Sequence, residues 1–220
     1  MIITLDGPAG AGKSSTARAL ARRLGWFYMD TGAMYRVATL VALERRVPLD
    51  DAAALATLAE SLAIVFRDGR VLVGDRDVSA EIRTEQITAA TRQVADAPPV
   101  REVMKRMQRQ LAAGIDVVTE GRDQGSVVFP RAELKVFLTA SPEERARRRH
   151  QEQAGNGGAT SLEAILDAQN RRDEGDRIRA VGAMRAADDA VVVETDGLSQ
   201  DEVVDRLVQL VEVRRPPRPA

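Results

Sequence analysis

Apolar residues are distributed along this chain in two alternating patterns, short continuous runs and one-sided helical spacings. The continuous runs lie at residues 1–5, 26–29, 117–119, 134–138 and 190–194. Between them, apolar residues three or four positions apart predict helices, as over residues 13–24. Short apolar strands separated by helices indicate a parallel sheet that is buried on both faces. The expected fold class is therefore α/β, with a five-stranded parallel sheet and flanking helices.

Capping residues mark the ends of several predicted helices. Gly25 follows the helix over residues 13–24, and Ser161 precedes a later one. Ser199 and Glu202 form a capping-box pattern that begins a final helix, which runs through Val213. Further helices are predicted over 32–46, from Asp50 or Asp51 to Leu62, from Thr84 to the Pro98-Pro99 break, over 100–111, from Pro142 to His150, and from Ser161 into 171–179.

Residues 64–79 show the pattern of short strands rather than of a helix. Ile64–Arg67 and Arg70–Val73 are β-rich runs separated by Asp68-Gly69, which is a typical hairpin turn. Residues 77–79 predict a third short strand. An antiparallel piece within an alternating βα chain indicates an inserted subdomain. A glycine-rich stretch at 154–159 and three prolines within 214–220 predict a flexible segment and a disordered tail.

Composition limits the function classes. The 220 residues suffice for one α/β core with insertions. The 32 basic and 33 acidic residues give a net charge of −1, which argues against nonspecific nucleic-acid binding. The absence of cysteine excludes disulfides and zinc–thiolate sites. Because the N-terminus lacks a signal-peptide pattern and no stretch approaches the ~20 apolar residues of a membrane span, we expect a cytoplasmic, soluble monomer.

One segment carries a specific chemical motif. After the first apolar run and before the first helix, the chain follows the pattern G-x-x-x-x-G-K-[ST]. Such a loop surrounds polyphosphate with backbone N–H groups, places its lysine on the β/γ oxygens and its hydroxyl on Mg²⁺. A glycine-rich turn with a chance lysine is the alternative interpretation. The predicted ATP-binding residues of this segment are Gly7, Pro8, Ala9, Gly10, Ala11, Gly12, Lys13, Ser14 and Ser15.

The placement of arginine narrows the function further. Six arginines lie near predicted strand ends, loop junctions or helix ends: Arg36, Arg101, Arg122, Arg148, Arg172 and Arg179. Guanidinium groups bind phosphate bidentately and spread transition-state charge. For the run Arg145–Arg149, a solvated helix face is an equally good interpretation. Arg122 directly follows a buried strand, which favours a functional role.

No residue stands out as a general base. His150 is the only histidine and lies in a charged helix, where a solvated role is the better interpretation. A hydroxyl acceptor needs a positioned base, whereas a phosphate acceptor has a second pKa of about 6 and is ionised at pH 7. The set of phosphate loop, Mg²⁺ and arginines therefore favours phosphoryl transfer to another phosphate.

Several segments together resemble bacterial cytidylate kinases, from about residue 2 to residue 213. The segments that carry the resemblance are LDGPAGAGKSSTA, YMDTGAMYR (28–36), VSAEIRT (78–84), VADAPPVRE (94–102), EGRDQGSVVFPRAELKVFLTAS (120–141) and RRDEGDRIR (171–179). The resemblance implies transfer of the γ-phosphoryl group of ATP to CMP or dCMP, with Mg²⁺. It also implies one P-loop kinase domain over 1–220. Its core is 1–38, 102–148 and 180–213, with a monophosphate-binding insert at 39–101, a helical lid at 149–179 and a tail at 214–220.

Site roles follow from the same resemblance. It implies that Thr31, Arg101 and Asp123 read cytosine, and that Arg36 and Arg122 hold the acceptor phosphate. Arg172 and Asp176 are implied at the sugar, Lys13 and Arg179 at the transferring phosphate, and Arg148 beside the ATP base. The implied catalytic residues are thus Lys13, Arg122, Arg172 and Arg179, with Ser14 at the Mg²⁺.

Several positions depart from the family's usual pattern, among them Gln124, Ser126 and the segment 181–184, which lacks the usual proline. Arg92 stands where the family usually has serine, and Glu120 replaces the usual aspartate before Gly121. Two other functions stay open. Another monophosphate kinase, with UMP as acceptor, is the nearest alternative function. A regulator that binds nucleotide without turnover is the other, although the acceptor-side arginines argue against it.

Overall fold

The computed structural model describes residues 1–155 and 160–215 of the chain. These residues form two compact units. The core unit contains residues 1–28 and the described residues from 114 onward, and the inserted unit contains residues 29–113. The chain passes from one unit to the other within a single strand, Phe27–Asp30.

A five-stranded parallel sheet forms the centre of the core unit, in the order β2-β6-β1-β7-β8. The strands are β1 (Ile2–Asp6), β2 (Phe27–Asp30), β6 (Val117–Glu120), β7 (Leu134–Thr139) and β8 (Val191–Glu194). The helices are α1 (Lys13–Leu24), α6 (Pro142–Gly155), α7 (Leu162–Arg177) and α8 (Gln200–Arg214), with a π-helical turn at Gln124–Val128. The predicted sheet is confirmed.

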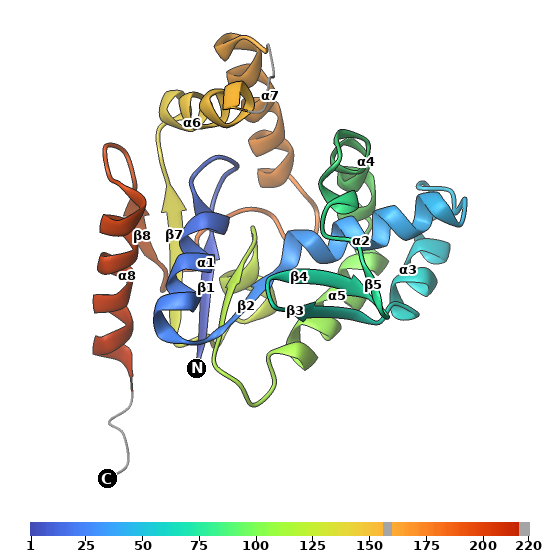
Figure 1. Cartoon of the computed structure of the whole chain (residues 1–220), viewed down its shortest axis with the longest axis horizontal. Coiled ribbons are helices and arrows are strands. Elements are labelled where there is room, and N and C mark those ends of the chain that lie inside the picture. The colour runs from blue at the N-terminus through green and yellow to red at the C-terminus, as the bar shows by residue number, and fades with distance from the viewer. Residues whose placement is uncertain (156–159, 216–220) are drawn as a thin grey trace. The chain divides into compact units, whose positions relative to one another are not determined.

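Burial explains why the strands are continuously apolar. Ile3 and Leu5 of β1 are fully buried, as is Leu138 of β7. Helices α1 and α8 contact each other, α1 also packs on β1 and β6, and α8 packs on β7 (Figure 1). Leu20 and Leu207 from these helices belong to the same apolar cluster as the strands. The central strands therefore meet apolar side chains on their faces rather than water.

The parallel register brings three chain segments to one edge of the sheet. Leu5 of β1 lies beside Glu120 of β6, and Asp6 lies beside Phe137 of β7. The Gly121 N–H extends the ladder by donating to the Leu5 carbonyl at 3.0 Å. The connections that follow β1, β6 and β7 therefore all start from this edge.

The inserted unit has its own apolar core. Its helices are α2 (Thr31–Glu44), α3 (Ala52–Glu60), α4 (Glu85–Asp96) and α5 (Pro98–Leu111), with a 3₁₀ turn at Glu81–Arg83. Its antiparallel strands are β3 (Ile64–Arg67), β4 (Arg70–Val73) and β5 (Arg76–Asp77). The predicted hairpin is confirmed, because Asp68 and Gly69 both adopt positive φ (51° and 74°), as a two-residue turn of this kind requires. The third strand, predicted over residues 77–79, begins one residue earlier and ends two residues earlier, at Arg76–Asp77.

The remaining differences from expectation are at element ends. Helix α6 continues past His150 to Gly155, so the glycine stretch does not end it early. The Ser199–Glu202 capping box is present at the start of α8. Residues 156–159 of the predicted flexible stretch, and 216–220 of the predicted tail, lie outside the described residues. Among the helices that are described, none is long and apolar enough to cross a membrane.

Candidate active site

The phosphate-loop motif connects β1 to α1, and its glycines are required by close packing. Gly7 has φ +141°, and a Cβ at this position would lie 1.9 Å from the carbonyl oxygen of Leu138. Gly12, at φ +84°, precedes the first residue of α1. The start of α1 presents free backbone N–H groups and the positive end of the helix dipole to the loop. The segment thus has the strand–loop–helix context that an anion site of this kind needs.

Lys13 lies at the start of α1 with its ammonium group buried. Its Nζ donates to the carbonyl oxygen of Pro8 at 2.7 Å. Burial, together with the positive charges of Arg122 and Arg172, lowers the pKa of Lys13 to about 7. The electrostatic influence of both arginines on this one amine brings the loop lysine and two predicted acceptor-side residues into a single electropositive site.

Ser14 and Glu120 form the part of the site suited to a hard cation. The Ser14 hydroxyl donates to Glu120 Oε1 at 2.8 Å, across the edge between β1 and β6. A hydroxyl and a carboxylate oxygen are donors that Mg²⁺ accepts, usually alongside water and substrate phosphates. The donor set therefore suits Mg²⁺. Glu120 was given no role from the sequence, although its position at a strand end beside β1 is a signal that could have marked it.

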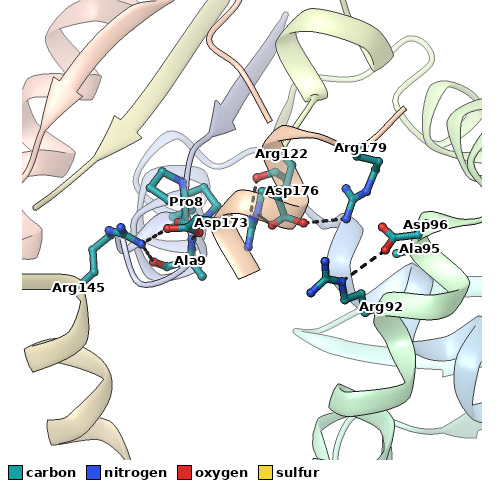
Figure 2. Close-up of polar contacts among 12 residues, drawn as sticks. Pro8, Ala9, Arg92, Ala95, Asp96, Arg122, Arg145, Asp173, Asp176 and Arg179 are labelled. Atoms are coloured by element: carbon teal, nitrogen blue, oxygen red, sulfur yellow. Dashed lines mark hydrogen bonds and ion pairs between the residues drawn. The ribbon is translucent and has the colours of Figure 1, made fainter. Parts of the chain in front are cut away.

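Asp176 of α7 joins two of the predicted arginines (Figure 2). Arg122 Nε donates to one carboxylate oxygen of Asp176 at 2.9 Å, and Arg179 Nη2 donates to the other at 2.7 Å. Burial alone would raise the pKa of Asp176, but the charges of Arg122 and Arg179 outweigh it and lower the pKa below its usual value. Two guanidinium groups are thus held side by side by one carboxylate.

A second buried carboxylate, Asp6, fixes the backbone next to Asp123. Asp6 accepts the N–H groups of Gln124 at 2.8 Å and Gly125 at 2.7 Å. Burial raises the pKa of Asp6 to about 7 despite these hydrogen bonds. Asp123 is itself buried and immediately precedes the π-helical turn that Asp6 holds. Asp6 was not predicted from the sequence, because its partners are 118 and 119 positions away.

Arg148 of α6 lies close to the phosphate loop but is bound elsewhere. Its guanidinium group donates to Glu144, to the Thr195 hydroxyl at 2.9 Å and to the Thr195 carbonyl at 2.6 Å. A Cβ on Gly12 would lie 3.8 Å from Arg148 Nη1. The structure therefore places Arg148 beside the loop, as its predicted ATP contact requires.

The inserted unit holds the other three predicted residues. Thr31 is the first residue of α2 and is buried. Asp30, which precedes it, caps the helix by accepting the Ala33 N–H. Arg36 donates to the Ile82 carbonyl at 3.1 Å and the Thr88 hydroxyl at 2.5 Å. Arg101 of α5 donates to the Ala95 carbonyl at 3.1 Å and stacks over the ring of Tyr35.

The predicted residues therefore fall into two sets. Those of the core unit gather at the carboxyl edge of the sheet and at α7: Lys13, Ser14, Arg122, Asp123, Arg148, Arg172, Asp176 and Arg179. The inserted unit contributes Thr31, Arg36 and Arg101. Arg172 is solvent-exposed on α7, whereas Asp173 beside it is buried and was not singled out from the sequence.

The fold and the loop define a P-loop protein. A solved structure of the protein TT1252 from Thermus thermophilus has a TM-score of 0.52 to this chain, covering 98% of each chain at 23% identity. At that identity the similarity concerns the fold alone.

The comparison with known sequences is more specific. A sequence model of the family described as "Cytidylate kinase" matches residues 3–213. The cytidylate kinase of Rhodopirellula baltica is 53% identical, covering 96% of this chain and 92% of the relative. That of Carboxydothermus hydrogenoformans is 44% identical, covering 96% and 97%. This chain belongs to the cytidylate kinase family.

Proposed function

We propose that this protein transfers the γ-phosphoryl group of ATP to CMP and dCMP, giving ADP and CDP or dCDP. The observation that carries the proposal is the family match over residues 3–213, a range that includes every predicted site residue. In the core unit, those residues supply a phosphate loop and a nearby arginine cluster, which suits transfer between two phosphates.

The roles proposed for the acceptor half follow the resemblance to the family. Cytosine offers an amine donor beside two acceptors, so a carboxylate and a guanidinium are complementary to it. We assign these roles to Asp123 and Arg101, with Thr31 beside them. Uracil would present a carbonyl to the Asp123 carboxylate, leaving two acceptors face to face at a cost of about 1–3 kcal/mol. Arg36 and Arg122 hold the acceptor phosphate, and Arg172 and Asp176 contact the sugar.

The donor half is the phosphate loop with Arg148 at the base. Backbone N–H groups of the loop hold the polyphosphate, and Lys13 and Arg179 stabilise the negative charge on the transferring phosphoryl group. The acceptor oxygen belongs to a phosphate that is largely ionised at pH 7, so no residue has to remove a proton from it.

Mg²⁺ is the proposed cofactor, held by Ser14 with Glu120 next to it. A Mg²⁺ ion held there would supply positive charge that neutralises part of the charge of the phosphates. Glu120 accepts a hydrogen bond from the Ser14 hydroxyl, which fixes the direction of the lone pairs on the Ser14 oxygen. The same carboxylate contributes negative charge that raises the pKa of Lys13, partly offsetting the effect of the arginines.

We assign two segments to substrate closure, the insert at 39–101 to CMP and the helical segment at 149–179 to ATP. Closure of such segments excludes water, which would otherwise compete as the acceptor. We further propose that the protein acts as a cytoplasmic monomer on free nucleotides. The near-zero net charge supports small-molecule substrates over nucleic acid.

A coupled ADP-release assay across CMP, dCMP, UMP, AMP, GMP and dTMP tests the proposal. CMP or dCMP is expected to exceed AMP and GMP at least tenfold in kcat/KM, with UMP next. An Asp123→Asn variant is expected to narrow the CMP-to-UMP ratio, because its amide can donate to a uracil carbonyl. Asp188→Asn, the same change at an exposed position, serves as the control.

Three results would contradict these assignments. Equal use of purine and cytosine acceptors would refute the substrate assignment. An unchanged CMP-to-UMP ratio in Asp123→Asn would remove Asp123 from base recognition. ATP binding without turnover on any of these acceptors would favour the nucleotide-binding regulator instead.

A further inference from the structure

The phosphate loop is held from outside by a buried ion pair that the proposed reaction does not use. Arg145 of α6 and Asp173 of α7 lie 2.5 Å apart, from Nη1 to Oδ2, with side chains only 4% and 3% exposed (Figure 2). Both also bind the backbone of Ala9. Arg145 Nη1 donates to the Ala9 carbonyl at 2.9 Å, and the Ala9 N–H donates to Asp173 Oδ1 at 3.3 Å.

This arrangement fixes one loop residue by both of its backbone groups. The carbonyl and the N–H of Ala9 point to opposite partners of one ion pair, so rotation of either flanking peptide would break a charged hydrogen bond. Arg145 is itself anchored, because its Nε donates to the Ala140 carbonyl at 3.1 Å. The next residue is also confined, since a Cβ on Gly10 would lie 3.0 Å from Arg145 Cβ.

The charges of Arg145 and Asp173 also affect the binding of an anion at the phosphate loop. A lone buried carboxylate next to the phosphate loop would repel the triphosphate. Paired with Arg145, Asp173 can accept the Ala9 N–H without adding net charge to the loop. Asp173 also lies one helical turn before Asp176, the residue that binds Arg122 and Arg179. The same helix therefore touches both the donor loop and the arginine cluster.

We propose that Arg145 and Asp173 are positioning residues that hold Ala9, and through it the phosphate loop, in the shape that binds ATP. The proposal rests on the ATP-dependent function above but not on the identity of the acceptor. Because the loop holds phosphate in both the ground state and the transition state, losing the pair should weaken ATP binding more than it slows turnover.

The test is a double variant, Arg145→Met with Asp173→Leu, which removes both charges while keeping the volume apolar and avoids leaving one charge buried alone. Steady-state assays are expected to show KM for ATP raised about tenfold or more, with KM for CMP changed less than twofold. Calorimetry with Mg²⁺ and the non-hydrolysable β,γ-imido-ATP is expected to show the same loss. That titration needs no acceptor, so it remains decisive if the CMP assignment fails.

Two further variants complete the design. Asp173→Asn preserves shape and serves if the double variant does not fold. Ala9 and Arg145 donate to different oxygens of Asp173, so the asparagine would present an NH2 group to one of these donors, and its ATP affinity should fall about threefold to fivefold. Arg147→Ala removes an exposed charge from the same helix, where it pairs with Glu144, and should leave ATP affinity within twofold. An ATP affinity within twofold of wild type in the folded double variant, or in Asp173→Asn, would overturn the proposal. Equal losses toward ATP and CMP would overturn it too, since they indicate general loosening.

Discussion

At the scale of single residues, burial has placed a loop lysine and a strand-end aspartate in unusual protonation states. Lys13 and Asp6 each have a pKa of about 7, lowered in one case and raised in the other, chiefly by burial. In the nucleotide-free protein, Lys13 is therefore only partly charged at neutral pH. Triphosphate next to its amine would favour the charged form and raise that pKa again.

Binding of ATP is consequently expected to take up a proton. Below pH 7 Lys13 is already protonated, whereas between pH 7 and 9 the amine must gain a proton as the nucleotide binds. ATP affinity should then fall by up to about tenfold for each pH unit over this range, because each unit between the pH and the Lys13 pKa corresponds to 1.36 kcal/mol. Calorimetry in two buffers of different ionisation enthalpy measures the proton number directly.

Lys13→Arg is the control for this measurement. Its guanidinium stays charged at every pH tested, so its binding should release or take up no proton through this position. Uptake below 0.2 proton per ATP by wild type at pH 8 would contradict the assigned shift in the Lys13 pKa.

At the scale of residues, the sequence predicts features that are contiguous in the chain, but not contacts between residues that only folding brings together. The loop from Gly7 to Ser14 is contiguous, so its spacing alone specifies its function. The partners of Asp6 and of Ala9 are more than a hundred positions away along the chain. Arg145 in turn lies in a run of charged residues that equally suits a solvated helix face, and only tertiary packing buries it.

At the scale of elements, helix α7 contacts both the phosphate loop, through Asp173, and the arginine cluster, through Asp176. Its buried face carries Ile165, Gln169, Asp173 and Asp176 at helical spacing. Two of these residues are carboxylates that bind arginines from other segments. The sequence predicted this helix and its Ser161 cap correctly, but not the inward direction of Asp173, because an RRDEGDR segment carries charge on every side.

Hydrogen exchange tests whether α7 closes over the substrates. The amides of residues 162–177 are expected to gain protection, with exchange slowed at least tenfold, when β,γ-imido-ATP and CMP are both present. Arginines held on Asp176 would then also contact phosphate, which stabilises the helix against local opening. Amides in the second half of α8, residues 207–214, serve as the internal reference, because the hydrogen bond from α8 to the loop residue Ser15 comes from the first residue of the helix, Gln200. Equal protection of α7 with and without nucleotides would show that it is not a lid.

At the scale of the whole molecule, the two units have separate apolar cores. Met104 lies in the core of the inserted unit and Leu207 in that of the core unit, and both are fully buried. The sequence indicated an insertion through its antiparallel hairpin, but the bounds 39–101 remain a functional prediction. Helix α2 runs unbroken from Thr31 to Glu44, so local pattern gives no break near residue 38.

Cavity-forming substitutions in the two apolar cores should weaken CMP binding and ATP binding to different extents. Met104→Ala and Leu207→Ala are each expected to lower the free energy of unfolding by about 2–5 kcal/mol. Met104→Ala should weaken CMP binding more than ATP binding, because Arg36 and Arg101 belong to its unit. Leu207→Ala is the matched control, with the reverse preference or none. Thermal unfolding and calorimetry measure both effects, and identical binding profiles for the two variants would contradict this division.

The pairing of β1 has a consequence for how the chain acquires its structure during synthesis. The strand that carries the phosphate loop leaves the ribosome well before its neighbours β6 and β7, which end only at Glu120 and Thr139. Until then, the apolar segment Ile2–Leu5 has no partner strands, and such long-range pairing slows folding. Residues 29–113, which have a core of their own, are complete earlier. Residues 29–113 are therefore expected to fold before the parallel sheet forms during synthesis. The phosphate loop that follows β1 is expected to be among the last segments to fold.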